Sequence, residues 1–177
     1  MKIHRRVAAG TSAVAAALPV MAVAQLLQLE AHNHGEVLLT LVQDAGSVTL
    51  ELITPQLNLL GFEHAPATEA ERQALLAAEA ALRQPGNWLQ LDGEGCSTGV
   101  ADLETSGEAQ HAENHAENHA DFSVRFAFTC ANATLRGLTF VGFAAYPGIH
   151  EVELQWLVQG KAGTATLTAK DSSVPLP

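Results

Sequence analysis

The sequence predicts an α+β domain with the element order ββαββαββ, in which a largely antiparallel sheet is packed by two helices. Two observations predict this class. Short segments of alternating apolar and polar residues recur along the chain, and two segments with helical features lie between them. A histidine-bearing excursion separates the two strands of the middle hairpin. We expect the helices to cover one face of the sheet and to leave the other face polar or partly covered.

The first 24 residues have the features of a secretory signal peptide. Residues 1–6 are basic, residues 7–20 form a short apolar run, and Ala22-Val23-Ala24 fits a small-residue cleavage site. We predict cleavage before Gln25, ordinary secretory export and a single mature domain of 153 residues, 25–177. An uncleaved anchor helix is the alternative. After cleavage, no apolar run in the sequence is long enough to span a membrane.

The charge of the chain is acidic. The formal net charge is −10, and it becomes −13 after cleavage because the signal holds three of the nine basic residues and none of the nineteen acidic ones. Negative charge disfavours nucleic acid and anionic membranes as partners and favours cations. An exported chain with an even number of cysteines normally pairs them, so we expect a disulfide between Cys96 and Cys130.

The first half of the mature chain predicts a hairpin and a helix. Residues 36–43 and 47–53 are rich in β-branched and apolar residues and flank Asp44-Ala45-Gly46, which indicates a β-hairpin. Thr68-Glu69-Ala70-Glu71 is a capping box. It predicts a helix that runs to about Arg83.

The middle hairpin is predicted from a weak strand at residues 96–103 and a strong strand at residues 122–129. Antiparallel pairing in constant register sets Cys96 opposite Cys130 and Glu104 opposite Phe122. A disulfide would then lie across the base of the hairpin. Residues 105–121 would form a flexible excursion, of a length that usually signals function or disorder.

The last third of the chain predicts a second helix and a last hairpin. Residues 133–146 are apolar with helical spacing despite two glycines. Residues 150–159 and 162–169 then read as two strands that turn at residues 159–162.

The excursion carries three histidines at intervals of four residues, His111, His115 and His119. In a helix, neighbours at this spacing share one face about 6 Å apart along the axis, so a pair can grip one metal ion, as can a loop that folds around the ion. The acidic residues interleaved with them are candidate oxygen ligands: Glu113, Glu117 and Asp121. Imidazole and carboxylate together suit a borderline divalent cation such as Zn²⁺.

The spacing of the tract does not match an enzyme motif. In His111-Ala-Glu-Asn-His115 the glutamate is one residue too late for a zincin, and the sequence has no Pro-Cys-x-x-Cys to complete a deaminase zinc site. We therefore predict no enzymatic activity. Two alternatives to a zinc site stay open: a solvated polar tract with incidental histidines, and an exported structural or interaction module whose histidines are solvent-exposed and bind no metal.

Two further places carry histidines that could bind a metal. His32 and His34, two residues apart, point to one side in an extended chain at the entry to the first strand. His64 lies beside Glu63, just before the first predicted helix. The alternatives are solvated histidines at a frayed terminus for the pair and a neutral histidine at the core edge for His64.

Four sequence features together resemble the bacterial periplasmic zinc-uptake proteins of the ZrgA type. These features are His32-Asn-His34-Gly35, Asn58-Leu-Leu-Gly-Phe-Glu-His64-Ala-Pro66, the histidine tract between two cysteine-bearing strands, and Phe126-Ala-Phe-Thr-Cys130. The resemblance covers nearly the whole mature chain. This chain departs from the family's denser histidine stretch, because its three tract histidines are spaced by Ala-Glu-Asn.

The resemblance implies a zinc-binding protein that is made under zinc limitation, captures the ion in the periplasm and assists import beside an ABC-type importer. By position, the resemblance implies two groups of candidate zinc ligands. The framework histidines, in the folded part of the domain, are His32, His34 and His64, and the tract histidines lie in the loop. His150 matches no ligand position in the resemblance. Imidazole binds metal only when neutral, and its ordinary pKa is about 6.5. Zinc capture is therefore expected to hold near pH 7 and to weaken steeply below about pH 6.

Overall fold

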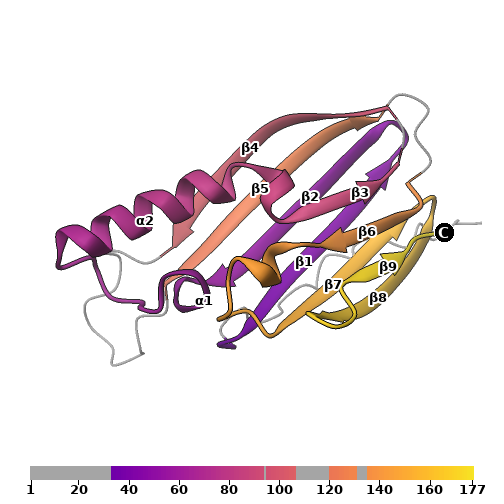
Figure 1. The fold of residues 1–177 in the computed structure, drawn as a ribbon. Coiled ribbons are helices and arrows are strands. Elements are labelled where there is room, and N and C mark those ends of the chain that lie inside the picture. Colours follow the sequence, from indigo (N-terminus) through magenta and orange to yellow (C-terminus); the bar gives the residue numbers. More distant parts are fainter. Residues whose placement is uncertain (1–32, 94, 107–119, 131–134) are drawn as a thin grey trace, which may run out of the picture.

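The computed structural model describes residues 33–93, 95–106, 120–130 and 135–177. In chain order its elements are β1 (Glu36–Asp44), β2 (Ser47–Pro55), α1 (Gln56–Leu60), α2 (Glu69–Leu82), η1 (Pro85–Asn87), β3 (Leu89–Asp92), β4 (Cys96–Ser106), β5 (Asp121–Cys130), β6 (Gly137–Phe140), η2 (Gly142–Ala144), β7 (Glu151–Val158), β8 (Lys161–Thr168) and β9 (Ser173–Pro175). Six strands form the larger sheet, in the order β4-β5-β2-β1-β7-β8, and three form the smaller sheet, β3-β6-β9. Figure 1 shows α2 and the smaller sheet over the same face of the larger sheet.

The α+β class with a mostly antiparallel sheet is confirmed, but the element order ββαββαββ is not. The larger sheet is mixed, because β1 and β7 pair in parallel, with Leu39 opposite Leu154. The hairpins β1–β2 and β7–β8 form where the sequence predicted them. The β1–β7 pair joins strands that are distant in the chain, so no local pattern announces it.

The helix predicted over residues 133–146 is wrong. The described part of this range forms the strand β6 and the short 3₁₀ helix η2. Each glycine in a helix interior costs about 1 kcal/mol relative to alanine, and Gly137 and Gly142 both fall in the range. At Gly137 a Cβ would lie 3.1 Å from the carbonyl oxygen of Val174 in β9, so the glycine lets two strands approach closely. The smaller sheet therefore supplies the cover that the sequence assigned to a second helix.

Both α-helices follow β2 and precede β3 in the chain. In α2 the predicted capping box is present: Thr68 Oγ1 accepts a hydrogen bond from the N–H of Glu71, and the Glu71 carboxylate accepts one from the N–H of Thr68. The helix ends at Leu82, as expected to within one residue. The five-residue helix α1 was not predicted. It ends at Leu60, and Gly61 caps it with a φ of 78°, in the left-handed region that glycine favours.

The β4–β5 hairpin has the predicted register at its base only. Cys96 lies opposite Cys130, and the structure records no free cysteine among the residues it describes. The predicted pairing of Glu104 with Phe122 is wrong, because Thr105 takes the position opposite Phe122. The strands also extend further than predicted, to the pair Ser106 and Asp121.

A β-bulge in β4 explains this shift of one residue. The register changes between Thr98 and Ala101, where the strand has one residue more than its partner. Gly99 lies in the bulge, and a Cβ there would be 2.7 Å from the carbonyl oxygen of Ala127 in β5. The close approach of the two backbones therefore requires glycine.

The two faces of the larger sheet differ as expected. On the covered face Val48, Leu50 and Leu52 are fully buried, together with residues of α2 and the smaller sheet. On the open face Glu51 Oε1 pairs with Arg125 Nη2 at 3.3 Å across β2 and β5. Within the described parts of the chain, no helix is long and apolar enough to cross a membrane.

Candidate functional site

His34 occupies the corner of a tight turn just before β1. The N–H of Glu36 donates to the carbonyl of Asn33 at 3.1 Å, and Gly35 has a φ of 89°. His34 Nε2 lies 3.1 Å from Glu63 Oε1; the histidine side chain is 48% exposed and the glutamate side chain 16%. The turn at the start of β1 therefore contacts the loop that follows α1.

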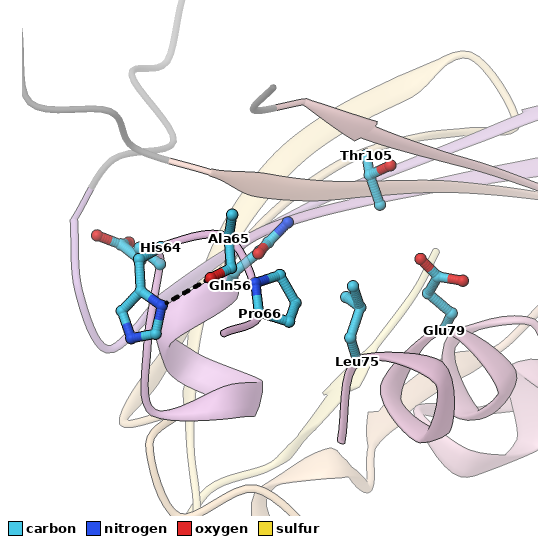
Figure 2. A pocket seen from close by; sticks show the side chains of 8 residues that line it. Gln56, His64, Ala65, Pro66, Leu75, Glu79 and Thr105 are labelled. Carbon is cyan, nitrogen blue, oxygen red and sulfur yellow. Dashed lines mark hydrogen bonds between the residues drawn. The ribbon is translucent and has the colours of Figure 1, made fainter. Parts of the chain in front are cut away.

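Two neighbours orient the ring of His64 in that loop. The ring of Phe62 stacks on it, with centroids 5.0 Å apart and planes inclined by 23°. His64 Nδ1 lies 3.0 Å from the carbonyl oxygen of Ala65, the contact that Figure 2 marks with a dashed line. A carbonyl only accepts, so Nδ1 carries the proton, and in the neutral ring Nε2 keeps the lone pair that can bind a metal.

Glu71 joins the start of α2 to this imidazole. Its Oε2 accepts hydrogen bonds from the N–H groups of Thr68 and Ala67, and its Oε1 lies 4.0 Å from His64 Nε2. The backbone N–H of Thr68, then that of Ala67, lower the pKa of the Glu71 carboxyl below its usual value of 4.5, and His64 acts in the same direction. The carboxylate is charged at neutral pH and faces Nε2 of the ring.

A hollow of about 240 Å³ lies beside His64. In Figure 2 Leu75 and Glu79 project from α2 on one side of it and Thr105 comes from the end of β4. Both polar and apolar side chains line it, contributed by Gln56, Glu63, His64, Ala65, Pro66, Leu75, Glu79 and Thr105. The hollow is therefore partly acidic.

The hollow lies at the end of the β4–β5 hairpin where the two strands are joined by residues 107–120. Ser106 pairs with Asp121 as the last pair of the two strands, directly after Thr105. The N–H of Gln56, another lining residue, donates to the carbonyl of Ala120 at 2.7 Å. Ser106 and Ala120, the described residues that flank the histidine segment (residues 107–119), thus lie next to residues that line the hollow.

The structure places only some of the predicted ligands. His32, His111, Glu113, His115, Glu117 and His119 lie outside the described residues. Asp121 is the first residue of β5 and is 7% exposed. His34 and His64 come from segments that meet at Glu63. Within the described ranges, no group of three or more His, Cys, Asp or Glu side chains is arranged to hold a metal ion.

Two residues of this arrangement were not among the predicted ligands. Glu63 contacts His34, and Glu71 faces His64. Glu63 adjoins a candidate histidine in the sequence, which is a weak signal. Glu71 is the third helical residue of a capping box. In the sequence, this capping role alone accounts for the glutamate, so nothing indicated a second contact with His64.

A comparison with known families gives a match over most of the chain. The family model described as "ZrgA family zinc uptake protein" matches residues 31–176. A search of curated proteins gives no match. The matched range includes the His34 turn, the loop with Glu63 and His64, both cysteines and the histidine segment.

Proposed function

Because the chain belongs to the ZrgA family of zinc uptake proteins, we propose that it is a non-enzymatic periplasmic protein that captures Zn²⁺ and assists its uptake. The observation that carries the proposal is the location of the hollow. His64 lines it, and so does Thr105, which lies one residue before the last paired residue of β4. The described chain on both sides of the histidine segment therefore lies beside the hollow that His64 lines.

The length of the segment limits how far its histidines lie from that place. His119 directly precedes Ala120, and His111 is five residues beyond Ser106. A polypeptide spans at most about 3.6 Å per residue, so His111 lies within about 18 Å of Ser106. The length of the chain therefore allows all three tract imidazoles to reach the hollow.

The donor atoms suit zinc. Zinc takes imidazole nitrogen and carboxylate oxygen in a tetrahedral arrangement, and His64 presents Nε2 with its tautomer fixed by a carbonyl. In the proposed site the tract histidines collect the ion and the framework histidines complete its coordination or receive it. The ligands drawn from the sequence are His111, His115, His119, Glu113, Glu117 and Asp121 in and beside the segment, and His32, His34 and His64 in the framework.

Export is part of the proposal. Residues 1–24 would direct secretion, and a disulfide between Cys96 and Cys130 would hold the base of the hairpin in the oxidising periplasm. The opposed positions of the two cysteines support this bridge. We propose a component of a zinc ABC-type importer as the acceptor of the ion.

The test is a zinc titration of residues 25–177 with a matched pair of triple variants. Replacing His111, His115 and His119 by alanine removes every imidazole of the segment, and we expect the affinity for zinc to fall by at least about 100-fold. Replacing Gln110, Asn114 and Asn118 by alanine changes the same segment equally but removes no imidazole, and should leave the affinity within about threefold.

The titration also separates the proposal from its rival. Wild-type affinity should be high at pH 7 and fall below about pH 6, where imidazoles are protonated. A wild-type chain that binds no zinc at pH 7 would overturn the proposal and favour an exported interaction module. Equal affinities of the two triple variants would remove the histidine segment from the site.

A further inference from the structure

Asn58, in α1, is a buried polar residue whose side chain is bonded at both ends. The residue is 5% exposed. Its Oδ1 accepts a hydrogen bond from the N–H of Gly35 at 2.7 Å, and its Nδ2 donates to the carbonyl of Glu36 at 2.8 Å and to Thr54 Oγ1 at 3.0 Å. Two of the three bonds go to the backbone of the residues that directly follow His34.

The opposite side of the His34 turn is held by the chain before β7. The carbonyl of Gly35 accepts hydrogen bonds from the N–H groups of His150 and Glu151, at 2.7 and 3.1 Å. A Cβ on Gly35 would lie 2.8 Å from His150 Nδ1, and one on Gly148 would lie 2.5 Å from the carbonyl oxygen of Asn58. The turn is thus enclosed between α1 and residues 148–151.

The same short helix leads to the second histidine-bearing segment. α1 ends at Leu60, Gly61 caps it in the left-handed conformation, and Glu63 and His64 follow. A helix of five residues has little stability of its own, so its position depends on tertiary bonds such as those of Asn58. The contact of His34 with Glu63 lies where the two segments meet.

Only an amide satisfies all three partners. An aspartate at this position would keep the acceptor for Gly35 but would face the carbonyl of Glu36 with an oxygen. A buried carbonyl opposed by a carboxylate loses its hydrogen bond and is repelled as well. The position therefore requires a side chain that both accepts and donates hydrogen bonds, as asparagine does. Because two of these bonds hold the residues directly after His34, they fix the position of His34.

We propose that Asn58 is a positioning residue for zinc binding, one that holds His34 beside the Glu63–His64 loop. This inference rests on the proposed function. Asn58 does not touch the ion; it acts through the backbone of the turn. Residues that orient metal ligands from outside the coordination sphere typically change affinity about 10- to 100-fold when replaced, and for Asn58 we expect about 10-fold.

The test is a double-mutant cycle in residues 25–177, read by zinc titration at pH 7. Asn58→Asp should weaken zinc binding about 10-fold, whereas in a His34→Ala background the same substitution should change the affinity less than about twofold. Leu138→Val, at a buried site in β6, is the control for lost stability and should leave the affinity unchanged. If Asn58→Asp does not fold, Thr54→Val removes one of the three bonds and should give a smaller loss that also disappears with His34→Ala.

Each other outcome identifies which claim has failed. Zinc binding by the wild type with no loss in Asn58→Asp overturns the inference and leaves the proposed function standing. A loss that persists in the His34→Ala background, or that Leu138→Val reproduces, makes Asn58 merely structural. Absence of zinc binding by the wild type overturns the proposed function itself.

Discussion

The hairpins β1–β2 and β4–β5 belong to one sheet but are closed in different ways. In β1–β2 the register is regular from Leu38 opposite Ile53 to Asp44 opposite Ser47, and two residues make the turn. In β4–β5 a bulge interrupts the register, and residues 107–120 separate Ser106 from Asp121. The first hairpin is closed by two residues, and the second carries a long segment rich in histidine and glutamate.

The difference shows how the fold can carry such a segment. Loop-closure entropy rises by only about 0.6 kcal/mol for each doubling of length, so a connection of fourteen residues in place of two costs about 2 kcal/mol. The two cysteines oppose each other at the other end of the hairpin. This end is close to the tight turn of β1–β2, because Thr129, next to Cys130, pairs with Ser47, the first residue after that turn. The opposed cysteines and the residues that flank the histidine segment thus lie at opposite ends of the hairpin.

The largest expected effect comes from removing the cysteines of the long hairpin. Cys96→Ser combined with Cys130→Ser should lower the free energy of unfolding by roughly 3 to 4 kcal/mol, because the unfolded chain loses a loop constraint. Urea denaturation of the double variant and of the wild type measures this difference. Reduction of the wild type should give the same loss and should not affect the variant; a wild type insensitive to reduction would mean that no bridge forms.

A second prediction concerns the bulge that distinguishes the two hairpins. Gly99→Ala places a Cβ 2.7 Å from the carbonyl oxygen of Ala127, so the strands must separate, with a loss of about 1 to 3 kcal/mol in unfolding free energy. Gly86→Ala, where no atom lies within 4 Å of the added Cβ, is the matched control. Equal stability of the two variants would contradict the close approach at the bulge.

A substitution in the tight turn of β1–β2 should increase the stability of the protein, in contrast to the one in the bulge. Ala45 has a φ of 49°, a region that is unfavourable for residues with a Cβ, so Ala45→Gly should raise the unfolding free energy by about 0.5 to 1 kcal/mol. Ala162→Gly, in strand β8, should lower it by a similar amount because glycine weakens a strand. Thermal unfolding of both variants tests the pair, and destabilisation by Ala45→Gly would refute the strained turn.

The smallest effect is the pH dependence of the α2 start beside the open end of β4–β5. The pKa of Glu71 is lowered in the folded chain, mainly by the backbone N–H of Thr68. Its stabilising contribution is therefore present above about pH 4.5, the usual value, and is lost as the pH falls through the lower folded pKa. Glu71→Gln should remove this part of the acid sensitivity. Parallel stability curves for wild type and variant between pH 7 and pH 3 would contradict it.

Local sequence signals predicted the elements whose partners are close in the chain. Asp44-Ala45-Gly46 marked the first hairpin, Thr68 to Glu71 marked the start of α2, and the cysteines marked the base of the middle hairpin. The parallel pairing of β1 with β7 and the whole smaller sheet were missed, since they join segments from distant parts of the chain. The register of β4–β5 beyond Gly99 was also predicted wrongly. The bulge at Gly99 depends on how closely the backbone of β5 approaches, which the sequence does not show.

The candidate site was predictable to a similar extent. Histidines stand out in a sequence by type and spacing, so His34 and His64 were identified. Their contacts with Glu63 and Glu71, and the bonds of Asn58 to the His34 turn, depend on the path of α1 and could not be read from spacing. The sequence thus identified candidate ligands but not the residues that position them.

The most direct test of the central claim, that segment and framework histidines share a zinc ion, is NMR of residues 25–177 with ¹⁵N-labelled histidine. On addition of one equivalent of Zn²⁺ at pH 7, we predict that the ring nitrogens of His34 and His64 shift together with those of at least two of His111, His115 and His119. Ring nitrogen signals that stay unchanged on zinc addition would contradict the account.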